Sequence, residues 1–273
     1  MQTETQRQHD LDTVVAAIRQ ELEVLDRYLA ALHLQGWSGA TACTEWTVQK
    51  TVSHLGSGAQ LHVGTLRTSL DGAEPIGDEA RRGVWDHFDS LAPEPLHAEF
   101  RGRTRDYLDY LANLPADKRG GRVQSFAGDT SIADFAQFRL FELSLHSWDI
   151  RVALDPTARL LPLTARTNFP HALGSLNRRA NKAAKAEMTG AAYRFEVFGP
   201  VTERFAIAVR DGNVDVGDAP HETVLATVRL PAEAFIRLYT GRLPLERAEA
   251  DGEVAIEGDR ASALRLNVLF PGF

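Results

Sequence analysis

The spacing of the apolar residues changes once along the chain, and this change limits the possible folds more than any other feature. From residue 10 to about 153 the apolar residues recur every three or four positions, which is typical of amphipathic helices. After Gly190 they alternate with other residues, as in Tyr193, Phe195 and Val197, which is typical of strands. The sequence therefore predicts a helical domain followed by a domain that contains a sheet.

Four long helical patterns occupy the first half of the chain. They cover residues 11–32, 47–70, 101–114 and 131–154. Thr47 suits the N-cap of the second pattern, and Asp71-Gly72 suits its end. Four long helices joined by loops favour an antiparallel bundle. We therefore predict an all-α four-helix bundle over residues 1–160.

The second half of the chain mixes helices and strands. A helix is expected at about residues 164–188. Strand patterns follow, with a hairpin turn at Asp211-Gly212, and Pro231 suits the first turn of a short helix. The sequence predicts a smaller α+β domain over residues 161–273.

The charge balance and the single cysteine narrow the possible partners and compartments. Lys and Arg total 30 against 37 Asp and Glu, and the net charge of −7 argues against sequence-independent binding to nucleic acid. Cys43 is alone, so no intrachain disulfide can form, which fits a reducing cytoplasm. The segment MQTETQRQHDLD is polar, and no apolar run approaches the ~18–20 residues of a membrane span. We expect a cytoplasmic protein without a signal peptide or a membrane segment.

Glu142 and His146 are the strongest candidates for chemistry. Because they are four residues apart on a predicted helix, they lie on one face and can reach a common point. The helix around them is apolar, so an ionised glutamate there needs a partner or a cation. His54 on the second helix, with His62 further along roughly the same face, offers a third ligand. Two histidines and a glutamate suit catalytic zinc, whereas the alternatives are a hydrogen-bonded Glu142–His146 pair and a His54 packed in the core.

An enzyme-borne nucleophile is hard to find in this sequence. No G-x-S-x-G, glycine-rich phosphate loop or H-E-x-x-H motif is present. Cys43 precedes the second helix and could be a reactive thiol or an ordinary half-buried cysteine. An enzyme with these residues would depend on a metal and on a nucleophile brought by a cosubstrate.

Several basic residues could bind an anionic molecule. Arg82 and Arg242 fall in loop-like positions that suit pocket residues, and Arg237 with Arg242 could clamp a carboxylate. A further basic group repeats at helical spacing and fits either an anion site or a solvated helix face: Arg178, Arg179, Lys182 and Lys185.

Two motifs stand in order along the bundle region. They are Cys43-Thr-Glu-Trp46-Thr-Val with His54-Leu, and Glu142-x-x-x-His146-x-Trp148-Asp149. Together they resemble the mycothiol-dependent maleylpyruvate isomerase family, and the resemblance continues through residues 224–241 to the closing Leu-Arg-Leu-Asn-Val. It implies a DinB-like metal-binding bundle followed by a domain similar to sterol carriers. One departure is Thr44-Glu45, where a Pro-Gly-like turn is expected before the tryptophan.

The resemblance also implies a cofactor and the residues that bind it. A divalent metal, typically zinc, would be held by His54, Glu142 and His146, and would bind and activate the thiol of mycothiol, a low-molecular-weight thiol of actinobacteria. Arginines from both domains would line the cleft, and Arg82 and Arg242 are their nearest equivalents here.

These features predict a metal-dependent enzyme in which the thiol of mycothiol attacks a small electrophile. The net reaction is S-transfer if the product is released, or cis–trans isomerisation, as in maleylpyruvate isomerase, if the adduct rotates and expels the thiol. The expected partners are the electrophile and the thiol, with no nucleic acid and no membrane, and the protein would be a monomer or a weak homodimer. The alternative is a non-enzymatic carrier of a small ligand with a structural metal site.

Overall fold

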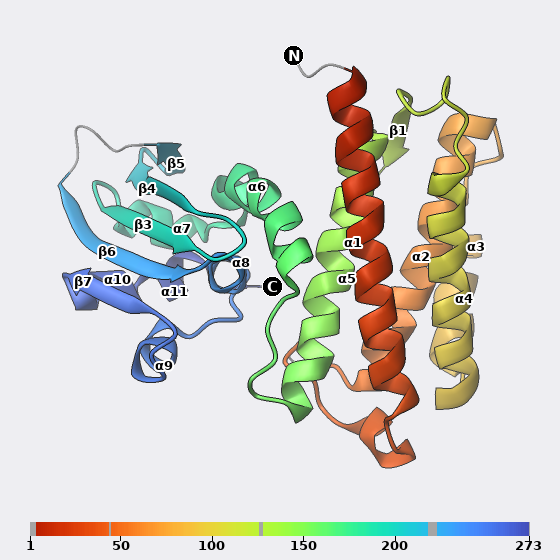
Figure 1. The fold of residues 1–273 in the computed structure, drawn as a ribbon, viewed down its shortest axis with the longest axis horizontal. Coiled ribbons are helices and arrows are strands. Elements are labelled where there is room, and N and C mark those ends of the chain that lie inside the picture. Colours follow the sequence, from red (N-terminus) through yellow and green to blue (C-terminus); the bar gives the residue numbers. More distant parts are fainter. Residues whose placement is uncertain (1–3, 44, 126–127, 218–222, 273) are drawn as a thin grey trace. The chain divides into compact units, whose positions relative to one another are not determined.

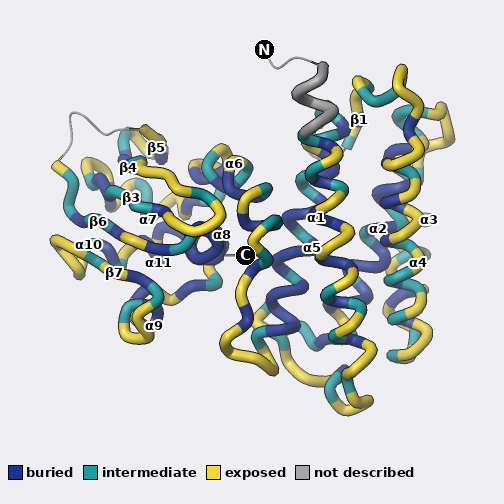
Figure 2. The backbone as a smooth tube through the Cα atoms, viewed as in Figure 1, coloured by how far each residue is buried: buried dark blue, intermediate teal, exposed yellow. Residues whose placement is uncertain are grey.

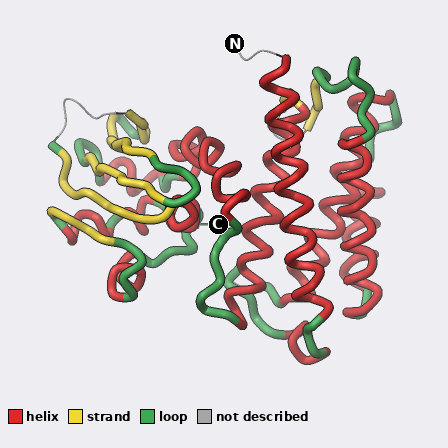
Figure 3. Tube along the Cα trace, in the orientation of Figure 1, coloured by secondary structure: helices red, strands yellow, loops and turns green. Residues whose placement is uncertain are grey.

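The computed structural model describes residues 4–43, 45–125, 128–217 and 223–272, with side chains described from residue 10 onward. The chain divides into two units, Met1–Leu160 and Leu161–Phe273 (Figure 1). Helices dominate the first unit, and the second combines helices with a sheet (Figure 3). The predicted fold class, a helical domain followed by a smaller α+β domain, is confirmed.

Five α-helices build the described part of the first unit. They are α1 (Glu4–Ala30), α2 (Val48–Asp71), α3 (Asp78–Ser90), α4 (Pro93–Ala112) and α5 (Ile132–Leu154). A short 3-10 helix η1 (Leu34–Ser38) and a hairpin of β1 (Arg122–Ser125) and β2 (Gly128–Ser131) complete it. Helix α1 packs against α4 and α5, and α2 packs against α3, α4 and α5. Helices α2 and α5 are therefore neighbours inside the bundle, although they are far apart in the sequence.

The predicted ends of two helices are confirmed by their capping contacts. The Thr47 side chain accepts a hydrogen bond from the Lys50 backbone N–H at 3.1 Å, and Gly72 ends α2 in the left-handed conformation. The Ser131 side chain accepts a bond from the Asp134 N–H at 3.0 Å at the start of α5. These caps fix the start and end of α2 and the start of α5, the two helices that carry the candidate site.

The sequence pattern missed parts of the first unit. Helix α3 was not predicted because it has few large apolar residues, and Phe88 is its one buried residue. Helix α4 begins at Pro93 and not near residue 101, since proline is tolerated in a first helical turn.

Helix α5 is the central helix of the first unit. It is buried along most of its length (Figure 2). Its buried residues include the charged side chains of Arg139 and Asp149, both 0% exposed. Because burying an isolated charge is costly, each of these groups must have a partner of opposite charge or a polar ligand.

A five-stranded mixed sheet forms the framework of the second unit. Its strands are β3 (Ala192–Phe198), β4 (Glu203–Arg210), β5 (Asn213–Gly217), β6 (Val224–Pro231) and β7 (Ala255–Gly258), in the order β5-β4-β3-β6-β7. The β3–β6 pair is parallel, and the other pairs are antiparallel. The helices are α6 (Pro162–Arg179), α7 (Lys182–Glu187), α8 (Ala232–Tyr239), α9 (Leu245–Ala250), α10 (Arg260–Leu264) and α11 (Leu266–Leu269). Phenylalanines of α6, α8, β3 and β4 pack together in its core: Phe169, Phe195, Phe205 and Phe235.

Two local predictions in this unit had different outcomes. The hairpin turn is confirmed, because Asp211 and Gly212 both adopt positive φ angles, 46° and 75°, between β4 and β5. The single helix expected over 164–188 is wrong. It is interrupted at Ala180, and the Asn181 side chain starts α7 by accepting a bond from the Ala184 N–H at 3.0 Å.

None of the described helices is long and apolar enough to cross a membrane.

Candidate metal centre and active site

His54 and Glu142 come together from helices α2 and α5. His54 Nε2 lies 3.0 Å from Glu142 Oε1, and the two side chains are 32% and 23% exposed. Both groups are therefore half-buried but still accessible from outside the bundle. This contact differs from the sequence alternative of a Glu142–His146 pair, because Glu142 turns toward the second helix.

The second oxygen of Glu142 faces a buried arginine that the sequence analysis did not single out. Arg139 Nη1 lies 3.3 Å from Glu142 Oε2, and Arg139 Nη2 donates to the Leu55 carbonyl oxygen at 2.6 Å. Burial raises the pKa of the Glu142 carboxyl, but the hydrogen bond from His54 and the charge of Arg139 hold this pKa well below its usual value. Glu142 is thus an ionised carboxylate inside the bundle.

His146 has its own carboxylate partner. Its Nδ1 lies 3.0 Å from Oδ2 of Asp149, which is fully buried. A carboxylate at Nδ1 favours the tautomer with the proton on that nitrogen, so Nε2 is left as the acceptor or metal ligand. Asp149 belongs to the second sequence motif. Its spacing of three residues from His146 on a helix is the signal that could have predicted this contact.

An aromatic ring connects the two histidines. Trp46 stacks on the His146 ring with centroids 5.5 Å apart and lies edge-on to the His54 ring at 5.0 Å. The His54 and His146 rings are themselves 5.3 Å apart. His54, Glu142 and His146, predicted as ligands from spacing and resemblance, therefore lie in one place beside Trp46.

Cys43 lies beside this cluster as well. The potential ligand atoms of Cys43, His146 and Asp149 are all within 4.8 Å of one another, and this is the one such group of three in the described residues. His146 thus belongs to two possible donor sets, one with His54 and Glu142 and one with Cys43 and Asp149. The potential ligand atoms of the first set do not all lie within 4.8 Å of one another. The Asp149 carboxylate already contacts His146 Nδ1. The second set is therefore equally consistent with a hydrogen-bonded histidine–carboxylate pair that has the Cys43 thiol nearby.

His62 lies deeper in the bundle than His54. It is 9% exposed, and its ring is 4.8 Å from the ring of Phe135. Burial lowers the pKa of His62 to about 4, and the charge of Arg139 contributes further to this lowering. His62 is therefore a neutral core residue and lies outside the donor sets.

The loop before Trp46 has an unusual backbone. Glu45 has a φ of 71°, in the left-handed region that favours glycine. This is the position where the resemblance leads us to expect the glycine of a Pro-Gly-like turn, while Thr44 lies outside the described residues. The loop therefore keeps a glycine-type conformation with a glutamate in place.

Comparison with known proteins identifies both units. Residues 18–151 match the profile of the mycothiol maleylpyruvate isomerase N-terminal domain. The first unit therefore contains a mycothiol maleylpyruvate isomerase N-terminal domain. Residues 171–271 match the SCP-2 sterol transfer family, so an SCP-2 domain follows it in the chain. No curated protein sequence is significantly similar to the chain.

Solved structures support the same fold for the chain. The chain is similar to a crystal structure of a mycothiol-dependent maleylpyruvate isomerase, with 16% identity and a TM-score of 0.61, over 85% of this chain and 90% of that one. A mutant of a mycothiol-dependent maleylpyruvate isomerase gives 15% identity and a TM-score of 0.61 over 90% and 92% of the two chains. At these identities the similarity shows that the fold is shared along almost the whole chain.

The arginines predicted to hold substrate differ in their surroundings. The loop-like position predicted for Arg82 is wrong, because this residue lies within α3, where it is exposed. Arg242 is half-buried after α8, where its Nη1 donates to the Thr240 carbonyl oxygen at 3.2 Å. Arg237, however, is buried in ion pairs with Glu233 and Glu253. The prediction that Arg237 clamps a substrate carboxylate is therefore wrong, because two carboxylates of the protein already neutralise it.

The structure adds a cation near Arg242. The Arg179 guanidinium lies 5.6 Å from the centre of the Tyr239 ring. Burial lowers the pKa of Arg179, and the charges of Arg178 and Arg242 lower it further. Positive charges therefore gather at the end of α6 and after α8. The sequence pattern indicated the basic group that includes Arg178 and Arg179, but it did not indicate that Arg242 lies near them.

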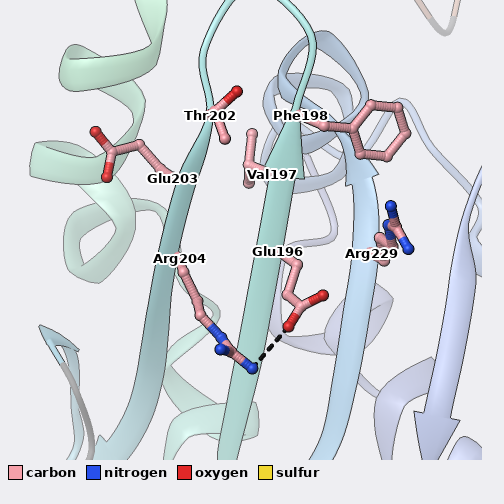
Figure 4. A pocket seen from close by; sticks show the side chains of 7 residues that line it. All are labelled: Glu196, Val197, Phe198, Thr202, Glu203, Arg204 and Arg229. Atoms are coloured by element: carbon pink, nitrogen blue, oxygen red, sulfur yellow. Dashed lines mark ion pairs between the residues drawn. The ribbon is translucent and has the colours of Figure 1, made fainter.

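A pocket of about 470 Å³ opens on the sheet of the SCP-2 domain (Figure 4). Glu196 on β3 faces Arg204 on β4 at 2.8 Å, and Arg229 on β6 lies 5.9 Å from the Phe198 ring centre. Four of the seven residues that line this pocket are charged, namely Glu196, Glu203, Arg204 and Arg229.

Proposed function

We propose that this protein is a metal-dependent cytoplasmic enzyme that uses the thiol of mycothiol as a nucleophile on a small electrophile. The observation that carries the proposal is the meeting of His54, Glu142 and His146 beside Trp46, in a domain of the isomerase family. The single cysteine of the chain supports a reducing compartment.

The donor set fits a divalent metal, for which zinc is the best candidate. His54, Glu142 and His146 would hold it, since two neutral imidazoles and one ionised carboxylate are a donor set that catalytic zinc takes with one position open. The low pKa of the Glu142 carboxyl and the anchoring of His146 Nδ1 by Asp149 support this fit. When bound, such a metal supplies Lewis acidity that lowers the pKa of a coordinated thiol.

The residues around the donor set have separate roles in this proposal. Asp149 holds the His146 ring in one tautomer and one orientation. Trp46 stacks on the His146 ring, where it would keep water from one face, and it lies edge-on to the His54 ring. The proposed roles of Arg82 and Arg242 in binding an anionic group of the substrate rest on their positive charge alone.

The same chemistry leads to either of two net reactions. Addition of the thiol sulfur to a carbon–carbon double bond leaves a single bond that can rotate. Expulsion of the thiol after rotation gives cis–trans isomerisation, whereas release of the sulfur-containing product gives S-transfer. The names of the structurally similar proteins support isomerisation, with maleylpyruvate as the first substrate to test.

The direct test combines metal analysis with a thiol-dependent assay. The purified protein should contain about one equivalent of divalent metal, and mycothiol with a candidate electrophile should be turned over only by the metal-loaded protein. A metal-free protein that accelerates the reaction equally well would contradict the proposal.

The SCP-2 match supports a second candidate, a non-enzymatic carrier of a small ligand with a structural metal site. A carrier requires no thiol chemistry. Binding of a fluorescent fatty-acid analogue by the second unit, with no thiol consumption in the presence of metal, would favour this candidate over the enzyme.

A further inference from the structure

Arg139 connects the two helices that carry the candidate metal ligands. It projects from α5 and is fully buried. One nitrogen contacts Glu142 Oε2 at 3.3 Å, and another donates to the carbonyl of Leu55, the residue that follows His54, at 2.6 Å. A single guanidinium therefore ties the backbone beside one ligand to the side chain of another.

The helix opposite Arg139 leaves room for it. Gly58 lies on α2, and a Cβ atom at that position would be 3.1 Å from Arg139 Nη1 and 3.9 Å from Glu142 Oε2. The small residue allows the guanidinium to lie against α2 while it reaches Glu142. Arg139 is thus held from both helices, and its position does not depend on solvent.

The two oxygens of Glu142 consequently have different surroundings. Oε1 is 3.0 Å from His54 Nε2, on the side of the histidine cluster, whereas Oε2 is directed to Arg139. A free carboxylate can bind a metal through one or both oxygens. A carboxylate with one oxygen paired to a buried guanidinium offers the other oxygen alone.

We propose that Arg139 is a positioning residue that restricts Glu142 to one metal-binding oxygen and thereby keeps a coordination position for the thiol. This inference rests on the proposed function, since it assigns a role toward the same metal. Without Arg139, Oε2 is released, and Glu142 can occupy the position that the thiol requires. Loss of the positive charge should also leave the affinity for a dication unchanged or increase it. A purely structural arginine would have the opposite effect, because its loss would loosen the site and weaken metal binding.

The test compares Arg139→Met and Arg139→Lys with the unmodified protein, using Co²⁺ as the metal and 2-mercaptoethanol as the thiol. Arg151→Met is the matched control, because Arg151 is also a buried arginine of α5 but bonds to Ser147 and Arg159. The measurements are Co²⁺ affinity by chelator competition, the visible ligand-field spectrum, and the thiol titration followed by the sulfur-to-cobalt charge-transfer band.

The proposal expects Arg139→Met to bind Co²⁺ at least as tightly as the unmodified protein, with a weaker ligand-field spectrum that indicates a higher coordination number. Thiol affinity should fall about tenfold or more, and Arg139→Lys should lie between the two. Arg151→Met should behave like the unmodified protein. If Arg139→Met fails to fold, the same comparison is made with Arg139→Lys.

Three results would overturn the inference, and they differ in meaning. Weaker Co²⁺ binding by Arg139→Met than by the unmodified protein would show that Arg139 has a purely structural role. Unchanged spectrum and thiol affinity in the Arg139 variants, with the unmodified protein binding Co²⁺, would overturn the role of Arg139 alone. Failure of the unmodified protein to bind Co²⁺ would overturn the proposed metal enzyme and this inference together.

Discussion

Each unit of the molecule buries an arginine among carboxylates, and the two clusters differ in composition. In the second unit, Arg237 is 2.8 Å from each carboxylate oxygen of Glu233 and is also paired with Glu253. In the first unit, Arg139 meets one oxygen of Glu142, and the other oxygen contacts His54. Both carboxylates around Arg237 contact the same guanidinium, whereas the carboxylate of Glu142 contacts both a guanidinium and the imidazole of His54.

This difference separates a structural cluster from a candidate functional one. The Arg237 cluster connects α8 to the segment before β7, and both of its carboxylates pair with the same guanidinium. The Glu142 cluster joins two metal-donor groups at a half-exposed position. A buried charged group is therefore not enough to identify a functional site. What distinguishes the two clusters is that the Glu142 carboxylate also contacts a histidine, whereas the carboxylates around Arg237 contact the arginine.

The largest expected effect is on the structural cluster. Arg237→Met leaves Glu233 and Glu253 buried without their cation, and it should destabilise the protein by about 3–5 kcal/mol. Metal content per folded molecule should not change. Denaturant unfolding monitors the loss, with Arg265→Met as the control, because Arg265 forms an exposed ion pair with Glu187. A loss below that of the control would show that the cluster is not structural.

Arg242, the next arginine after Arg237 in the sequence, should affect activity and not stability. Arg242→Ala should lower kcat/KM by about ten- to a hundredfold for an anionic electrophile, because a charge-assisted contact of about 1.5–3 kcal/mol is lost. Stability should change little. Arg247→Ala is the control, since Arg247 is largely exposed on α9. Equal kinetics for the two variants would remove Arg242 from the substrate site.

In the first unit, Asp149, which contacts His146 Nδ1, should affect the affinity for the metal. Asp149→Asn keeps the shape of the side chain but removes the charge that holds Nδ1, so metal affinity should fall about 10- to 100-fold. Metal competition with a chelator measures the change, and Asp155→Asn serves as a control at the end of the same helix. If affinity is unchanged, His146 is not positioned by Asp149.

The smallest expected effect concerns the loop before Trp46. Glu45→Gly should stabilise the first unit by up to about 1 kcal/mol, because glycine adopts the left-handed conformation without the strain of a side chain. Glu45→Ala keeps the Cβ atom and should give no gain. The midpoints of denaturant unfolding compare the two, and equal midpoints would mean that Glu45 is unstrained.

The sequence predicted what depends on local pattern. Apolar spacing, the Thr47 cap and the Asp211-Gly212 turn all rest on residues within one or two turns of each other, and each is confirmed. Glu142 and His146 were found because a helix brings residues four apart to one face. Helix α3 was missed because its few large apolar residues give only a short helical pattern.

Contacts between distant segments could not be read from the sequence. Arg139 sits on a helix buried on several sides, so the apolar pattern does not show that it faces Leu55 on α2. Arg237 was misinterpreted because Glu253, its partner, lies beyond α9 and reaches it only after folding. In both cases the charge of the arginine was evident, but its partner was set by tertiary structure.

The central claim is that His54, Glu142 and His146 hold a metal, and metal content measures this most directly. The purified protein should carry about one equivalent of divalent metal. Glu142→Ala should lose most of it while its helical circular dichroism stays close to that of the unmodified protein. Cys43→Ser should retain both the metal and most of the thiol-dependent activity. The reverse result, with metal kept by Glu142→Ala and lost by Cys43→Ser, would place the ion with Cys43, His146 and Asp149 and contradict the account.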